Sequence, residues 1–314
     1  MTHAKATLLL PARNRFPGGA LPAPVATALG RAARTVGEAG ESAQLHRHFT
    51  AQPQAWSAAA LTRQHDAGDA AGSLWLRADP ANVVPDMQGA RLMAASEALR
   101  LEQDDVEALL PALQPLFAGF GFQLDAPTSS RWYLRLPGDT PLPAFAAPES
   151  VLGDDLFEHL PEGEHGRRWR SLLTEVQVLL HQHPWNAQRI AQGKRAVNSL
   201  WFWGAGQLPE SVRTVHAQVR SRDALLQGLA MLAGVPAQSG QGDGEQAVDA
   251  LVDLRQLRSL EQLTRDAITP LLDAVKRGEL RELQLDFEDG VQYRIHRGQR
   301  WCFWKKPQAA LSND

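Results

Sequence analysis

The segment HPWNAQRIAQGKRAVNSLWFWGAGQLP, residues 183–209, holds the densest group of side chains in this sequence that could bind a charged ligand. Arginine and lysine supply charged donors and asparagine amides supply neutral ones, a combination that suits an oxyanion such as phosphate or carboxylate. Glycines that directly follow a strand also let the backbone approach a ligand closely. The candidate ligand-binding residues of this segment are His183, Asn186, Arg189, Lys194, Asn198, Trp201, Trp203, Gly204 and Gly206.

In this hypothesis Asn186 and Asn198 orient an anion, the basic side chains neutralise it, and Trp201 and Trp203 form an apolar floor. A structural interpretation of the same residues is also open. The tryptophans would then be core residues, the asparagines would be caps, and the basic side chains would be solvated. The Gly-x-Gly lacks a third glycine, so it is not a dinucleotide-binding motif.

The elements around this segment place it at the end of a strand. Residues 165–183 carry apolar side chains at helical spacing and predict an amphipathic helix that ends at Pro184. A polar loop then leads to a buried strand predicted at residues 197–203. Ligands of open α/β sheets collect beyond the carboxyl ends of strands, which favours a binding site here. Asp79, before Pro80 at the end of another predicted strand, is a further candidate, although a turn-forming role is the alternative.

Strand and helix patterns alternate over most of the chain, which predicts an α/β sheet with helices on both faces. The first strand is the apolar run ATLLLPA, and helices are predicted within QDDVEALLPALQPLFAGFG, with Gly119 just past the helix end, and at residues 259–278. Polar and apolar residues alternate in the tail, residues 282–306, with Asp289-Gly290 as a hairpin turn. This tail predicts a C-terminal β meander.

Composition excludes several classes of function. The chain has 314 residues, a formal net charge of −3 and no long basic run, so nucleic acid is not an expected partner. No apolar stretch approaches the length needed to span a bilayer. The short apolar run near the start lacks a cleavage pattern and predicts a strand, so we expect a cytoplasmic protein. The single cysteine, Cys302, excludes an internal disulfide and a cysteine-based zinc site.

Two histidine pairs, His46-x-His48 and His181-x-His183, could each offer two metal ligands. Residues two apart on a helix point to different faces, so one metal ion is poorly served by such a pair. Surface or capping histidines are therefore predicted. His183 is the exception, because it borders the candidate site.

The segment of residues 183–209 resembles HPxNxxRxxxGxxxAN, followed by an apolar strand and GxGxxP, in the archaeal-type cofactor-independent phosphoglycerate mutases of the alkaline-phosphatase-like superfamily. LRADPANVVPDMQGARLM is similar to their strand–turn–DxxAGR segment, more loosely. Nearly the whole chain also resembles bacterial regulatory proteins labelled RpfE-type, through LWLRADP, LPEGEHGRRWRSLLTEVQVLLHQHP and NSLWFWGAGQLP.

The mutase resemblance implies a serine or threonine nucleophile beside two divalent metals that aspartate and histidine hold. The family has an acidic Asp-Gly motif after its first strand and a later Asp-x-x-Gly-His motif, and this sequence has neither. Arg13 and Arg15 follow the first strand instead, and guanidinium groups repel a divalent cation and attract an anion. We therefore expect no metal and no cofactor, and Arg13 and Arg15 join the candidate ligand-binding residues. The resemblance further implies an alkaline-phosphatase-like core of residues 1–75 and 196–314, with a smaller α/β insert at 76–195.

The leading hypothesis is a metal-free, non-catalytic phosphoglycerate-mutase-like protein with a regulatory role that binds a small anion or phosphorylated metabolite. One alternative is an active mutase or phosphatase with a divergent metal site. A second alternative is a scaffold whose tryptophan-rich surfaces bind a protein partner.

Overall fold

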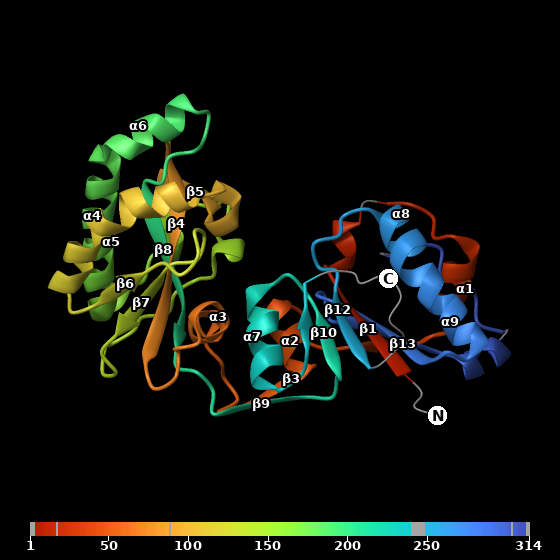
Figure 1. Ribbon diagram of the computed structural model, residues 1–314. Coiled ribbons are helices and arrows are strands. Elements are labelled where there is room, and N and C mark those ends of the chain that lie inside the picture. Colours follow the sequence, from red (N-terminus) through yellow and green to blue (C-terminus); the bar gives the residue numbers. More distant parts are fainter. Residues whose placement is uncertain (1–3, 17, 88, 240–248, 303, 312–314) are drawn as a thin grey trace. The chain divides into compact units, whose positions relative to one another are not determined.

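The computed structural model describes residues 4–16, 18–87, 89–239, 249–302 and 304–311 (Figure 1). The chain forms two compact units. The first unit comprises Met1–Gln54 and Ser211–Asp314, and the second unit comprises Ala55–Glu210. No helix among the described residues is both long enough and apolar enough to cross a membrane.

The first unit is built on a seven-stranded sheet with the order β11-β10-β12-β1-β13-β14-β2. The first five strands of this order run parallel, whereas β14 is antiparallel to both of its neighbours. The strands are β1 (Ala4–Leu10), β2 (Ala33–Val36), β10 (Gln218–Arg220), β11 (Ala237–Gln238), β12 (Ala250–Asp253), β13 (Leu280–Phe287) and β14 (Val291–His296). A separate pair joins β3 (Phe49–Gln52) to β9 (Ser211–Thr214).

Helices cover both faces of this sheet (Figure 1). Leu8 and Leu10 of β1 pack in a core with α1 and α9, whereas Leu9 is buried outside that core. This alternation is the one expected for a strand that is covered on both sides. The helical elements are α1 (Ala23–Arg31), α2 (Glu41–His46), α7 (Ala224–Leu232), α8 (Leu260–Gln262), α9 (Thr269–Arg277), the 3-10 helices η1 (Arg13–Arg15) and η6 (Arg297–Trp301), and the π-helix η5 (Leu263–Ile268).

The second unit has an antiparallel sheet in which β4 is the long central strand. Its strands are β4 (Leu74–Asp86), β5 (Gly89–Ala95), β6 (Gln123–Asp125), β7 (Tyr133–Leu136) and β8 (Ser199–Gly206). Apolar residues of α4 and α5 pack on one face with Leu76 and Leu134, while α3 packs with Trp75 and Tyr133 on the other. The helical elements are α3 (Ala58–Ala67), α4 (Gln103–Gly119), α5 (Gly163–Gln182), α6 (Pro184–Ala191) and the 3-10 helices η2 (Ser96–Leu99), η3 (Pro148–Ser150) and η4 (Leu156–His159).

The boundaries of this unit differ from the insert expected at residues 76–195. Strand β8 pairs with β4 from Trp75↔Gly206 to Ala81↔Ser199, so both strands belong to one sheet. Because α3 packs on that sheet as well, the compact unit is Ala55–Glu210. The sequence gives no local sign of this pairing, since the two strands are separated by more than a hundred residues.

The prediction of an α/β fold, with helices on both faces of a central sheet, is confirmed. The Asp289-Gly290 turn is also confirmed, because it joins β13 to β14 with Gly290 at a φ of +85°. The C-terminal meander is shorter than predicted. After β14 the chain forms η6, so the tail contributes one hairpin to the main sheet.

Candidate functional site

The carboxyl ends of the parallel strands in the first unit meet at one edge of its sheet, where ligands of α/β proteins collect. An arginine-centred group of polar residues lies there. We call it the Arg255 cluster, and its members are Glu41, Ser221, Asp223, Asp253 and Arg255. Asp253 is the last residue of β12 and Ser221 directly follows β10, so the strands themselves position the cluster.

Within the Arg255 cluster the guanidinium occupies the centre. Its Nε lies 2.8 Å from Asp253 Oδ1 and a second nitrogen lies 3.0 Å from Asp253 Oδ2. The other contacts reach Glu41 at 2.5 Å and Asp223 at 3.6 Å. Burial raises the pKa of Asp253, but the hydrogen bonds and charge of Arg255 outweigh burial, and this pKa lies below its usual value. Asp253 is therefore an ionised carboxylate that Arg255 already neutralises.

A dinuclear metal centre would need carboxylates that converge on a cation. Here the carboxylates converge on a guanidinium, which repels divalent cations and takes up both oxygens of Asp253. Across the described ranges, no group of three or more His, Cys, Asp or Glu side chains is arranged to hold a metal ion. The residues present at this edge do not fit two divalent metals.

Arg13 and Arg15 follow β1 at the same edge. Arg13 is buried, its Nε lies 2.7 Å from Asp289 Oδ2, and it also donates to the carbonyl oxygen of Leu311. Arg15 is exposed on η1. Arg13 thus ties the end of β1 to the β13–β14 turn.

A buried histidine pair in the first unit was missed in the sequence. His48 Nε2 lies 2.9 Å from Asp286 Oδ2, and its Nδ1 lies 3.0 Å from His216 Nε2. Asp286 is fully buried and also accepts two hydrogen bonds from Arg47. The prediction of a surface position is correct for His46 and wrong for His48. The sequence signal that could have revealed this buried group is the alternation of side chains along β13, which places Asp286 on the opposite face of the strand from Leu285.

Burial, and then the neighbouring His48, lower the pKa of His216 to about 4. Its imidazole is therefore neutral at physiological pH, and the His48–His216 pair is a hydrogen-bonded part of the core. Through these hydrogen bonds, His48, which directly precedes β3, joins His216 in the loop before β10 to Asp286 of β13.

In the second unit, both candidate asparagines bind backbone. Asn186 donates to the carbonyl oxygens of Leu180 and Val197 and accepts from Val197 N, each at 2.8 Å. Asn198 accepts from Val83 N at 2.8 Å and donates to Val83 O at 2.7 Å. His183 is the N-cap of α6. These three side chains hold the turn from α5 to β8 in place.

Arg189 is 1% exposed and belongs to a buried network. A terminal nitrogen lies 2.5 Å from Asp105 Oδ2, and the guanidinium donates to two backbone carbonyls. Burial raises the pKa of Asp105, but hydrogen bonds from Arg189, the Glu102 backbone and Trp185 lower it overall. Lys194 pairs with Glu102 at 3.0 Å on the surface.

Asp79 and Trp203 are brought together in a second buried network. Asp79 is 0% exposed, forms a two-pronged ion pair with Arg77 at 2.8 and 2.9 Å, and accepts from Trp203 Nε1 at 2.7 Å. Arg77 also lies over the rings of Tyr133 and Trp203. Trp201 instead donates to the Ala146 carbonyl.

The Gly204-x-Gly206 turn approaches a helix. A Cβ at Gly204 would lie 3.0 Å from Ala58 Cβ, and one at Gly206 would lie 2.9 Å from Ser57 Cβ. Ser57 Oγ caps α3 and donates to the Gly204 carbonyl at 2.7 Å. Because these two glycines have no side chain, the start of α3 can pack closely against the turn. Anion binding by residues 183–206 stays a prediction, and the structure gives most of those side chains protein partners.

The fold and these sites describe a two-unit α/β protein similar to phosphoglycerate mutases. A probable 2,3-bisphosphoglycerate-independent phosphoglycerate mutase of Geobacter sulfurreducens is 30% identical over 93 residues, which cover 30% of this chain and 23% of that protein. The 2,3-bisphosphoglycerate-independent enzyme of Methanosarcina barkeri is 33% identical over 101 residues, with 30% and 25% covered. A third, from Methanothermobacter thermautotrophicus, is 27% identical over 188 residues, with 48% and 46% covered. The chain thus matches less than half the length of each of these relatives.

Among solved structures, the PH0037 protein from Pyrococcus horikoshii has a TM-score of 0.52 and 13% sequence identity. The likeness covers 98% of this chain and 91% of that one, and it shows a shared fold. No family model matches the sequence.

Proposed function

We propose that this chain is a phosphoglycerate-mutase-like protein that does not catalyse phosphoryl transfer and has a regulatory role in the cytoplasm, where it binds a small anionic or phosphorylated metabolite. The similarity to the mutases supports the first part of the proposal. The resemblance to RpfE-type proteins supports the regulatory part.

One observation carries the loss of catalysis, namely the Arg255 cluster at the carboxyl edge of the main sheet. Two-metal phosphoryl transfer depends on cations that stabilise both the attacking and the leaving oxygen. A guanidinium fixed among the carboxylates at this edge takes the place of such a cation. All three of its nitrogens already donate to carboxylates of the protein, so its charge is balanced before any phosphate arrives.

Metal analysis and a mutase assay test this proposal. After dialysis against Mn²⁺, the wild-type protein should retain no stoichiometric metal, and phosphoglycerate should not be isomerised above background. One or more Mn²⁺ per chain together with turnover would overturn the proposal, and the active mutase or phosphatase would take its place.

Substitution of Arg255 gives a second readout. Arg255→Ala uncovers Asp253, Asp223 and Glu41, so Mn²⁺ should raise the melting temperature of this variant and leave that of the wild type unchanged. Arg258→Ala is the matched control, because Arg258 is exposed three residues later and donates to backbone carbonyls. Equal responses of wild type and Arg255→Ala to Mn²⁺ would show that Arg255 does not exclude metal.

A further inference from the structure

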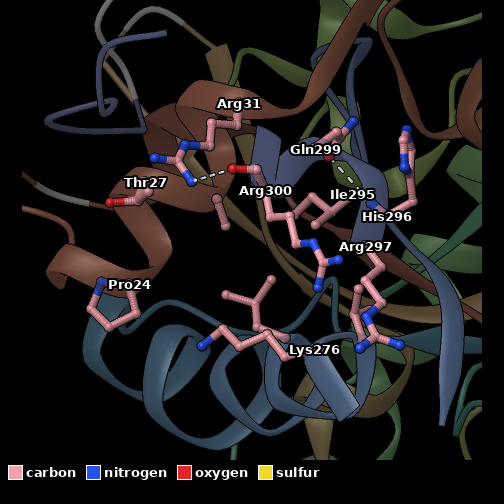
Figure 2. Close-up of a pocket in the computed structure, with 12 residues that line it drawn as sticks. Pro24, Thr27, Arg31, Lys276, Ile295, His296, Arg297, Gln299 and Arg300 are labelled. Carbon is pink, nitrogen blue, oxygen red and sulfur yellow. Dashed lines mark hydrogen bonds between the residues drawn. The ribbon is translucent and has the colours of Figure 1, made fainter. Parts of the chain in front are cut away.

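A hollow of about 230 Å³ lies in the first unit, between α1, α9 and the turn from β14 into η6 (Figure 2). Its floor is apolar and is formed by Leu272, Val275 and Ile295, all of which are buried. The hollow is also lined by four basic side chains, those of Arg31, Lys276, Arg297 and Arg300. We call this hollow the basic pocket.

The lining of the basic pocket contains four basic side chains and no acidic one among the described residues. Figure 2 shows these side chains reaching the hollow from different elements, so the charges gather although they are distant in the sequence. The same elements carry acidic residues elsewhere. Asp273 of α9, for example, pairs with Lys276 at 2.9 Å but does not line the hollow.

The arginines of the basic pocket are short of anionic partners. In the part of the chain that the structure describes, Arg297 and Arg300 form no ion pair, and Arg300 lies over the Trp301 ring. Arg31 donates to the Arg300 carbonyl at 3.3 Å, while its buried Nε has no hydrogen-bond partner among the described residues. A buried donor without a partner is costly and indicates a missing acceptor.

Like charges that gather in one hollow repel each other, and an anion among them relieves this repulsion. The planar forks of arginine suit the two oxygens that a phosphate or carboxylate presents. The buried leucine, valine and isoleucine suit an apolar body beneath the charged group. The volume lies below the roughly 300 Å³ at which drug-sized pockets begin, so the ligand is small.

We propose that the basic pocket binds a small organic anion, with a phosphate or carboxylate held by Arg31, Arg297 and Arg300 and an apolar body held against Leu272 and Ile295. This inference extends the ligand-binding part of the proposed function. It assigns the ligand to a surface outside both the Arg255 cluster and residues 183–206.

Calorimetric titration with phenyl phosphate tests the pocket, because this probe combines a phosphate with a compact apolar ring. The wild type should bind it, and inorganic phosphate and phenol should each bind more weakly, since each makes only half of the contacts. The double variant Arg297→Ala/Arg300→Ala should weaken binding by at least about tenfold, the loss expected when two charge-assisted interactions are removed.

Arg277→Ala is the matched control, because Arg277 is an exposed arginine of α9 that pairs with Glu279 and does not line the pocket. This variant should bind phenyl phosphate within about twofold of the wild type. Circular dichroism checks that each variant is folded. If folded wild-type protein binds no phenyl phosphate when this ligand is present at millimolar concentration and in tenfold excess over the protein, the proposed pocket is wrong. Equal binding by the wild type and the double variant would overturn the proposal as well.

The outcomes separate this inference from the proposed function. Turnover with bound Mn²⁺ would end the non-catalytic proposal and leave the pocket untouched. Binding of phenyl phosphate that survives the double variant but is lost in Lys194→Ala would move the anion site back to residues 183–206.

Discussion

Basic side chains gather in two regions of this protein, and their partners differ. In residues 183–206 of the second unit, Arg189 is 1% exposed and pairs with Asp105, and the surface Lys194 pairs with Glu102. In the basic pocket of the first unit, Arg297 and Arg300 are exposed and form no ion pair among the described residues. A basic side chain that already holds a carboxylate is a structural element, whereas one without such a partner can bind an anion.

The positions of the neutralising carboxylates in the sequence explain why residues 183–206 were the stronger candidate for anion binding when only the sequence was considered. Its basic residues lie close together in the chain, but the carboxylate that neutralises Arg189 is Asp105 of α4, about 80 residues earlier, which also accepts a hydrogen bond from Trp185. The charges of the basic pocket come from three separate elements and form no motif. Sequence proximity therefore favoured a region in which Arg189 and Lys194 are already paired with carboxylates.

The largest effect that follows from this comparison is the loss of Arg189. Arg189→Ala leaves Asp105 buried without its ion-pair partner, so the free energy of unfolding should fall by about 3–5 kcal/mol. Urea unfolding followed by tryptophan fluorescence measures this change. Lys194→Ala is the control and should change it by less than about 0.5 kcal/mol, because its ion pair is exposed. A stable Arg189→Ala protein with weakened anion binding would restore the anion hypothesis for this segment.

A buried group of the first unit should give the next largest effect, which depends on pH. The folded pKa of His216 is about 4, below the ordinary value of 6.5, because burial and His48 disfavour its charge. The unfolded chain therefore takes up a proton first as the pH falls. His216 contributes stability above pH 6.5 that is lost progressively towards pH 4, at most about 3 kcal/mol.

Unfolding free energies between pH 7 and 4 test this loss. His216→Gln does not titrate and can still hydrogen-bond to His48, so it should lose less stability over this range than the wild type. His46→Gln, at an exposed position of α2, is the control and should follow the wild type. Identical pH dependence of all three proteins would show that His216 is not held neutral.

The local elements could be predicted from the sequence because their causes are local. Residues 165–183 predict the helix observed at Gly163–Gln182, and Gly278 ends α9 in the left-handed conformation. Ser259 caps α8 by accepting from Gln262 N, as its sequence indicates. Helical spacing, caps and turns depend on neighbours within a few residues, which a sequence displays.

The candidate site was harder to predict because its chemistry depends on distant partners. The sequence shows that the metal-binding motifs are missing after β1, but it does not show that Arg255 meets Glu41 and Asp223. Asp79 could be singled out from its place before Pro80, yet its partners Ser96 and Trp203 come from other elements. Pairing of β4 with β8 brings Trp203 to Asp79, and strand pairing across a long loop leaves no local pattern.

A smaller effect distinguishes packing from ligand binding at the glycine turn of the second unit. Gly204 has a φ of +68° and faces Ala58 of α3, so Gly204→Ala adds a steric clash to a left-handed conformation that alone costs roughly 1–2 kcal/mol. Gly193→Ala is the matched control, because its φ is +73° and its Cβ would meet open space. Gly204→Ala should be the more destabilising in urea. Equal losses would mean that α3 does not require the close approach.

The smallest effect on stability is expected in the basic pocket, where the arginines balance no buried charge. Arg297→Ala and Arg300→Ala should each change the free energy of unfolding by less than about 0.5 kcal/mol, since each removes one exposed cation from a group of like charges. The pocket variants should differ from the wild type in their response to ligand. Phenyl phosphate stabilises a protein that binds it in the folded state, so it should raise the melting temperature of the wild type and of Arg277→Ala more than that of either pocket variant. Destabilisation of a pocket variant by as much as Arg189→Ala would mean that these arginines, too, serve the fold, and the contrast between the two regions would disappear.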